Sequence, residues 1–124
     1  MICILVVFST CLRCSQYEAY LDLLLDSMTP PEEGDSPSSS TSDHKPLVRS
    51  GSLIFCDNIL WKGRVMAAAT RASDPPPPGE DKAAKRDRVL AQAMHEFNVK
   101  VRKEKRVEQV VLPLRDGLTL IRVL

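Results

Sequence analysis

Two adjacent oxygen-bearing side chains, Asp57 and Asn58, end a hydrophobic run, and Trp61 follows three residues later in the segment GSLIFCDNILWKGRV, residues 51–65. Carboxylate and amide oxygens suit hard divalent cations such as Mg²⁺. Ligand sites in open α/β sheets lie outside the carboxyl ends of strands. The pattern therefore indicates a binding or catalytic site at a strand end. A turn formed by the Asp-Asn pair, with Trp61 packed in the core, is the structural alternative.

Other residues that could do chemistry give weaker signals. The segment CLRC, residues 11–14, has the spacing of a redox pair or half a zinc site, but no second pair follows, so reduced and inert thiols are expected. His44 lies in a polar stretch and His95 stands alone on a predicted helix, so neither indicates a metal site. The basic run KVRKEKR, residues 100–106, is predicted to be the solvated end of that helix, and it lacks the interleaved aromatics of a nucleic-acid surface.

Length and charge limit what the chain can be. Its 124 residues are enough for one small domain, and the net charge of +1 gives no general attraction to nucleic acid or acidic membranes. Residues 27–46 are dense in Ser, Pro and acidic side chains, so a disordered insert is expected over about 27–50. The proline run in residues 72–81 predicts a second loop without helix or inner strand.

Four ordered pieces must position the candidate site. A short apolar run at 2–8 and the segment SLIFCD at 52–57 are typical of buried strands. A helix is expected after Ser15 as its N-cap, and a second from Glu80 to about Lys103. The inward faces of these helices are predicted to carry, in the first, Tyr17, Tyr20, Leu21, Leu24 and Leu25, and in the second, Val89, Leu90, Ala93, Met94, Phe97 and Val101.

The chain closes with two β runs, at 107–114 and 118–123, joined across Arg115-Asp116-Gly117, which is a hairpin signal. All four strands should share one sheet. The first two should be parallel because a helix connects them, and the last two antiparallel because a tight turn does. The N-terminal run could also be the apolar part of a signal peptide. No basic residue precedes it and no clear cleavage site follows, so a cytoplasmic strand is preferred.

Three segments together resemble one family. GSLIFCDNILWKGRV resembles the strand-five segment of the cation-dependent class I O-methyltransferases of the caffeoyl-CoA and catechol type. VVLPLRDGLTLIRVL resembles that family's closing hairpin, and QYEAYLDLLLDS resembles the helix before the first of these strands. The resemblance implies an α/β fold in which this chain forms the C-terminal half of a Rossmann-like methyltransferase sheet with a terminal antiparallel hairpin. Residues 1–26 would supply a strand and a helix, and residues 51–124 the methyltransferase segment.

The resemblance also implies an activity. Members transfer a methyl group from S-adenosylmethionine to a small phenolic or catechol-type hydroxyl, with the help of a divalent cation, expected to be Mg²⁺. Asp57 and Asn58 would be metal ligands and Trp61 would line the acceptor pocket. A homodimer is implied, with neither nucleic acid nor membrane as a partner.

Two departures from the family pattern set a limit on that expectation. The five glycines of the chain form no G-x-G-x-x-G set for the methyl donor. Where the family has Asp-Ala-Asp-Lys, whose first Asp is the third metal ligand, this chain has Cys11, Leu12, Arg13 and Cys14. We therefore expect a truncated polypeptide that is inactive alone, with no catalytic or donor-binding residue assignable. The alternative is a non-catalytic fragment that pairs with another chain through an exposed sheet edge.

Overall fold

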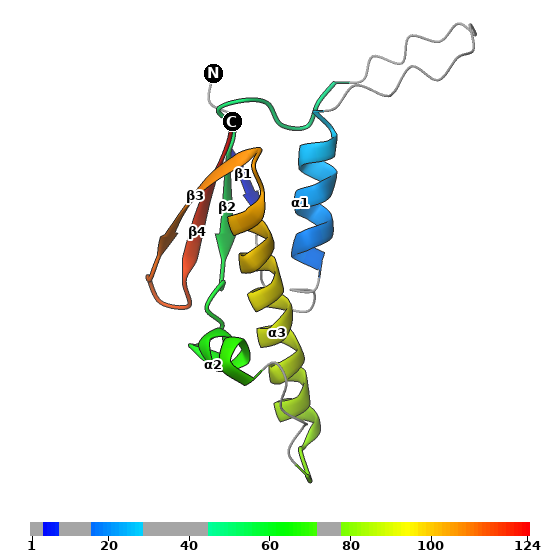
Figure 1. The fold of residues 1–124 in the computed structure, drawn as a ribbon, viewed down its shortest axis with the longest axis vertical. Helices are drawn as coiled ribbons and strands as arrows, with labels where there is room; N and C mark the ends of the chain where they lie inside the picture. Colours follow the sequence, from blue (N-terminus) through cyan, green and yellow to red (C-terminus); the bar gives the residue numbers. More distant parts are fainter. Residues whose placement is uncertain (1–3, 8–15, 29–44, 72–77) are drawn as a thin grey trace, which may run out of the picture.

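The computed structural model describes residues 4–7, 16–28, 45–71 and 78–124. Figure 1 shows a small sheet with helices beside it. In chain order the elements are β1 (Ile4–Val7), α1 (Tyr17–Asp26), β2 (Leu53–Asp57), α2 (Arg64–Arg71), α3 (Lys82–Lys103), β3 (Val107–Leu112) and β4 (Leu118–Val123).

The four strands form one sheet in the order β1-β2-β4-β3. β1 runs parallel to β2, whereas β4 runs antiparallel to both β2 and β3. The predicted sheet, its two strand directions and the closing hairpin are therefore confirmed. The turn of that hairpin has Gly117 at φ +85°, in the left-handed region that glycine tolerates best.

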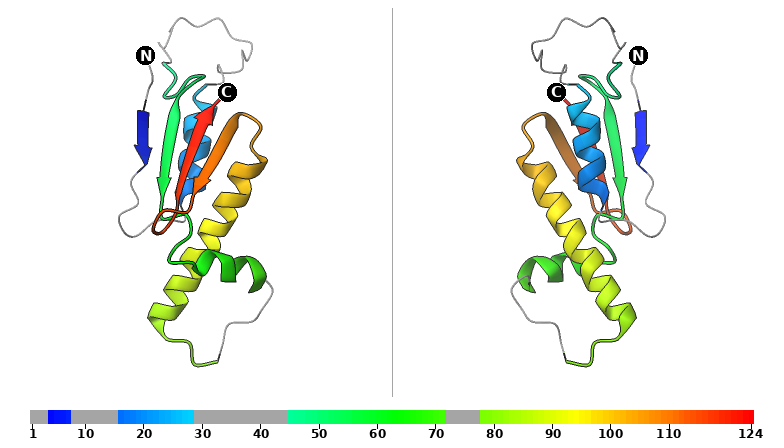
Figure 2. Two further views of the ribbon diagram at one scale, coloured as in Figure 1. Left: turned by 90° about the vertical axis from the view of Figure 1, so that its left-hand side faces the viewer. Right: turned by 90° about the vertical axis from the view of Figure 1, so that its right-hand side faces the viewer.

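Both α1 and α3 lie on the same face of this sheet, which the two views of Figure 2 show. Residues alternate along β2 and β4, so that Ile54, Cys56, Thr119 and Ile121 turn toward the helices and are buried. The helices contribute the other half of the core with Tyr17, Leu21, Leu24, Leu25, Leu90, Met94, Phe97 and Val101. Burial of these apolar side chains is the main force that holds the two layers together.

The opposite face of the sheet carries an apolar row across three strands. Phe55 of β2 is paired with Leu120 of β4, which is paired with Val110 of β3. Among the described residues no helix covers this face (Figure 2), and the Val110 side chain is 57% exposed. The described sheet is thus buried on one side only.

Three details differ from the sequence-based expectations. Val89 is exposed, because the buried side of α3 carries its neighbours Leu90 and Ala91 and leaves Val89 on the solvent side of the helix. Tyr20 is also exposed, with its hydroxyl bonded to Gln16 Oε1 at 3.2 Å. The short helix α2 was not predicted; its Val65 is buried in the core.

The long helix matches its predicted range closely. Asp81 is its N-cap, with a side-chain oxygen that accepts from Ala84 N at 2.7 Å, and the helix ends at Lys103.

Near the C-terminal border of the predicted insert, Val48 is buried in the core. Residues 29–44 of the insert, 72–77 of the proline-rich loop, and residues 8–15 with CLRC lie outside the described residues. The N-cap of α1 is Gln16 and not the predicted Ser15, and Gln16 forms no side-chain cap hydrogen bond. Along the described ranges, no helix combines the length and apolar character needed to cross a bilayer.

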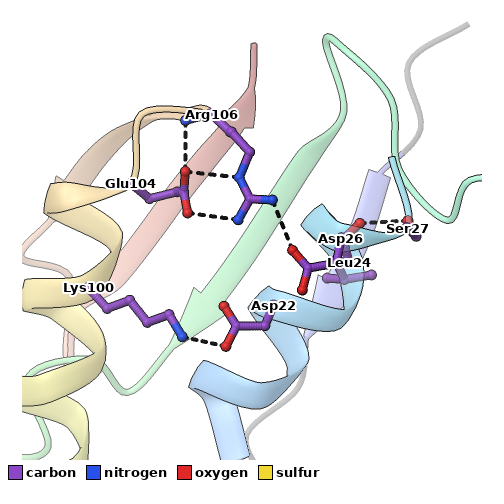
Figure 3. A network of polar contacts seen from close by, with 7 residues as sticks. All are labelled: Asp22, Leu24, Asp26, Ser27, Lys100, Glu104 and Arg106. Carbon is purple, nitrogen blue, oxygen red and sulfur yellow. Dashed lines mark hydrogen bonds and ion pairs between the residues drawn. The ribbon is translucent and has the colours of Figure 1, made fainter. Parts of the chain in front are cut away.

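The end of α3 is tied to α1 by a set of charged side chains that we call the ion-pair corner: Asp22, Asp26, Lys100, Glu104 and Arg106 (Figure 3). Lys100 Nζ lies 2.5 Å from Asp22 Oδ2, and Arg106 Nη1 lies 3.0 Å from Asp26 Oδ1. Arg106 also forms a two-pronged contact with Glu104, at 3.0 and 2.9 Å. The basic run was predicted to be a solvated helix end. Its ion pairs show that it also takes part in the packing of α3 on α1.

Within the ion-pair corner, the hydrogen bonds from Arg106 lower the pKa of the Glu104 carboxyl to about 2. An arginine fork on a carboxylate favours the ionised form in this way because both N–H donors point at the charged oxygens.

Candidate metal and acceptor site

Asp57 is the last residue of β2 and Asn58 is the first residue after it. The Asp57 side chain is exposed, and one of its oxygens, Oδ1, accepts a hydrogen bond from Asn58 N at 2.7 Å. Both residues therefore stand at the carboxyl end of a strand, where ligand sites of α/β sheets are found. This bond reaches the next amide, whereas the Asx turn of the structural alternative uses the amide two residues on.

The loop that follows β2, residues 57–63, which we call the site loop, has an unusual backbone. Asn58, Trp61 and Lys62 all have positive φ angles, of 60°, 43° and 55°. Such conformations cost about 1–3 kcal/mol for residues such as Trp61 and Lys62 and less for Asn58, because Asn tolerates positive φ angles, and the costly ones persist only where surrounding contacts impose them. The site loop is therefore held in shape by its neighbours.

Three elements supply those contacts. From α1, the Tyr17 hydroxyl donates to the main-chain oxygen of Asp57 at 3.3 Å. From α3, Asn98 Nδ2 donates to the main-chain oxygen of Ile59 at 2.9 Å. From the β3–β4 turn, the main-chain oxygens of Asp116 and Gly117 accept from the amides of Leu60 and Ile59, at 2.8 and 3.3 Å. The site loop thus joins both helices and the hairpin.

Neither Tyr17 nor Asn98 was identified as a site residue from the sequence. Tyr17 was predicted only as a core residue, and its ring does pack against Phe97 with 5.2 Å between the ring centroids. Asn98 gave no distinct signal, because other polar and charged residues, His95, Glu96 and Lys100, lie around it in the same stretch of α3. Half-buried amides need hydrogen-bond partners, but that Asn98 is half-buried follows only from the fold.

Trp61 packs against the hydrophobic core and is partly buried. Its indole Nε1 is buried and has no hydrogen-bond partner within the described part of the chain. An indole N–H without an acceptor is costly inside a protein, so the present surroundings leave Trp61 one unmet polar contact.

Asp57 and Asn58 offer the type of donor atom that a hard cation prefers, but two residues are too few to complete its coordination. A carboxylate and a side-chain amide offer oxygen donors, which Mg²⁺ prefers. Within the described ranges, however, no cluster of three or more His, Cys, Asp or Glu residues could complete a site. Cys11 and Arg13, at the positions aligned with the family's third ligand, lie outside the described residues. A cation bound by Asp57 and Asn58 alone would keep most of its waters.

The remaining candidates do not join this site. Cys56 is buried on the helix side of β2, and burial raises the pKa of its thiol to about 12. The thiol is therefore protonated and unreactive near neutral pH, as expected for an inert cysteine. His95 is half-buried and lines an open groove of about 550 Å³ along α3, with Lys100 and Lys103.

Comparisons with known proteins place the chain among methyltransferases. A family model described as O-methyltransferase matches residues 42–124. Tricin synthase 2 of Oryza sativa subsp. japonica is 34% identical over 77 residues, which are 61% of this chain and 23% of that protein. The chain is also similar to the crystal structure of the SAH-bound methyltransferase PaMTH1 of Podospora anserina, with a TM-score of 0.65 and 21% sequence identity. The superposition covers 98% of this chain and 41% of the PaMTH1 chain.

The chain therefore spans less than half of the length of these relatives. The superposition shows that its α/β architecture is part of a methyltransferase fold. The family match covers the site loop, α3 and the closing hairpin, which include two of the three segments on which the resemblance was based. The resemblance is thus confirmed, and the chain belongs to the O-methyltransferase family.

Proposed function

We propose that this chain supplies the cation-binding and acceptor-binding end of an S-adenosylmethionine-dependent O-methyltransferase that acts on small phenolic or catechol-type hydroxyls. The observation that carries this proposal is the placement of Asp57 and Asn58 at the carboxyl end of β2 in a member of this family. The tricin synthase relative supports an aromatic acceptor. In the terms of the fold, the chain would be the C-terminal half of a Rossmann-like sheet.

In this proposal each site residue has a distinct role. Asp57 and Asn58 bind the divalent cation, proposed to be Mg²⁺, through their side-chain oxygens. A bound cation lowers the pKa of a nearby hydroxyl and so makes its oxygen more nucleophilic. Trp61 contributes an aromatic ring beside the acceptor, and closer packing on a bound acceptor would give its indole N–H a polar partner. The methyl transfer itself then depends on alignment of donor and acceptor.

The proposal divides the chain into three parts. Residues 1–26 provide a strand and helix α1, residues 27–50 form an insert, and residues 51–124 form the methyltransferase segment. Because the five glycines form no donor-binding set, we propose that the 124-residue chain does not bind S-adenosylmethionine well enough to turn over by itself. A cytoplasmic location, where the methyl donor and reduced thiols occur together, belongs to the same proposal.

Methyl incorporation into a catechol, with labelled S-adenosylmethionine and Mg²⁺, tests this function. We expect no turnover by the 124-residue chain, and turnover when it is extended with a Gly-rich donor-binding half. In the extended protein Asp57→Ala should abolish turnover, whereas Glu108→Gln, a change at an exposed residue of β3, should not. Turnover by the short chain would refute the donor-site part of the proposal, and an active Asp57→Ala protein would refute the site.

A second candidate function rests on the sheet itself. β3 is an outer strand of the described sheet, and its Val110 and Val111 are 57% and 48% exposed. Outer strands with unpaired backbone groups and apolar side chains readily pair with another chain. A non-catalytic role through such pairing, or the homodimer that the family resemblance implies, would use this edge.

Sedimentation analysis distinguishes this second function. Pairing through β3 predicts a dimer or larger assembly that Val110→Lys and Val111→Lys weaken, because charges on an edge strand oppose pairing. A monomer at all accessible concentrations would contradict it, and would leave the methyltransferase proposal unaffected.

A further inference from the structure

The site loop is held at two main-chain oxygens that flank Asn58. On one side Tyr17 of α1 donates to the oxygen of Asp57, and on the other Asn98 of α3 donates to the oxygen of Ile59. Each donor comes from a different helix, and each acceptor is the carbonyl of a residue next to Asn58. Tyr17 thus holds the peptide group before Asn58, and Asn98 holds the peptide group after Ile59, so that the short segment around Asn58 is held at both ends.

This arrangement matters because Asn58 has a φ angle of +60°. Asn adopts the left-handed region more readily than most other non-glycine residues, but it does so in a minority of its conformations, so surrounding contacts are needed to keep it there. A change in the φ or ψ angle of Asn58 would move the Asp57 and Ile59 carbonyls relative to each other, so that one of them would leave its donor. The two hydrogen bonds therefore oppose the same backbone rotation from both ends.

The donors themselves are well anchored. Tyr17 is 4% exposed and its ring packs on Phe97, which is 1% exposed and directly precedes Asn98 in α3. The two donors thus share one support in the core, where α1 meets α3. A donor held by such packing loses little side-chain entropy when it forms its hydrogen bond.

We propose that Tyr17 and Asn98 are positioning residues, which act as a clamp that keeps Asn58 in its left-handed conformation and so directs the Asp57 and Asn58 oxygens toward one cation. The proposal rests on the proposed function of the site loop. It assigns to the helices α1 and α3 a role in the site besides their role in the core.

Two variants remove the clamp with little change in volume, Tyr17→Phe and Asn98→Leu. Each has a matched control on the same helix: Tyr20→Phe, which removes an exposed hydroxyl, and Gln92→Ala, which removes a surface contact with Glu96. The first readout is amide hydrogen exchange at Ile59 and Leu60, compared with amides of the β2–β4 ladder. The second is the dissociation constant for Mn²⁺, measured with each 124-residue protein.

We expect exchange at Ile59 and Leu60 to rise about two- to tenfold in each clamp variant, the range that follows from the loss of one hydrogen bond. The amides of the ladder and both controls should stay close to wild type. Mn²⁺ binding should weaken by a similar factor in the clamp variants only. A purely structural role would instead raise exchange along the ladder as well.

The outcomes separate this inference from the function on which it rests. If wild-type protein binds no Mn²⁺, the cation site is wrong, and the exchange data alone decide whether the clamp exists. Unchanged exchange in the loop, a uniform rise across the sheet, or Mn²⁺ binding equal to wild type in both clamp variants would overturn the proposal. Should Asn98→Leu fail to fold, the isosteric Tyr17→Phe decides by the same criteria.

Discussion

The ion-pair corner and the site loop lie toward opposite ends of the sheet, and they are built in opposite ways. The corner uses charged side chains that are partly open to solvent, with several partners around Arg106 (Figure 3). The site loop uses main-chain carbonyls, each with one side-chain donor, and three non-glycine residues with positive φ angles. In the ion-pair corner, Arg106 has several partners, so no single contact is essential. In the site loop, the backbone is strained and each main-chain carbonyl depends on one side-chain donor.

The difference shows which region of this small fold depends on its individual contacts to keep its backbone conformation. A surface ion pair can be lost at little cost because water replaces its partner. A strained loop depends on each contact that holds it, and strain of this kind concentrates at functional sites. The contrast supports the site loop, and not the charged corner, as the functional part of the chain.

Alanine at Gly117 should produce the largest effect on the free energy of unfolding. A Cβ there would lie 2.5 Å from Leu60 Cγ and 3.0 Å from Ile59 Cδ1, and the backbone has φ +85°. Overpacking against the site loop and the strained φ angle together should cost about 2–5 kcal/mol. Gly51→Ala is the matched control, because Gly51 has φ +84° with no atom within 4 Å of its Cβ position. It should cost about 1–2 kcal/mol.

Urea unfolding of both variants measures this difference. Equal losses at Gly117 and Gly51 would mean that the turn does not press on the site loop, and the contrast between the two ends of the sheet would weaken.

Removal of the arginine at the centre of the corner should have a smaller effect. Arg106→Gln breaks the contacts with Asp26 and Glu104, and should lower the free energy of unfolding by about 1 kcal/mol because the group is partly exposed. High salt should reduce the loss by screening. Arg122→Gln, which breaks an exposed pair with Glu108, should change stability by less than about 0.5 kcal/mol. A loss above that of Gly117→Ala would contradict the proposed redundancy of the corner.

The smallest effect is expected from pH. The pKa of Glu104 is about 2 in the folded chain, below its ordinary value of 4.5, so its contribution to stability is complete above about pH 4.5 and is lost as the pH falls toward 2. Glu104→Gln should therefore reduce the stability difference between pH 6 and pH 3 by about 1 kcal/mol or less, given solvent screening. Thermal unfolding at the two pH values measures this change, with Glu108→Gln as the control. An unchanged pH dependence in Glu104→Gln would show that the Arg106 contact does not persist in solution.

Much of the fold could be predicted from local patterns. The apolar run of β2, the hairpin signal at Gly117 and the long amphipathic helix each follow from residue spacing over a few positions. The exposure of Val89 could not be predicted, because it depends on which side of α3 packs on the rest of the fold, and that side carries Leu90 and Ala91. The same is true of α2, whose eight residues follow a loop with several positive φ angles.

The candidate site divides in the same manner. Asp57, Asn58 and Trp61 stand together in the sequence and could be recognised there. Tyr17 and Asn98 lie 40 and 39 residues from the carbonyl groups they contact. Only the packing of α1 and α3 against one face of the sheet brings them to the site loop, and no local pattern records that packing.

Paramagnetic broadening of the backbone amide signals by Mn²⁺ tests the central claim most directly, because it locates a bound cation on the chain. The proposed site predicts that low concentrations of Mn²⁺ broaden the amides of Asp57, Asn58 and Ile59 first. It also predicts that Asp57→Asn removes this effect and leaves the rest of the spectrum unchanged. Broadening that begins instead at the acidic residues Asp22 and Asp26, or that persists around Asn58 in the Asp57→Asn protein, would contradict the assignment of the site loop as the cation site.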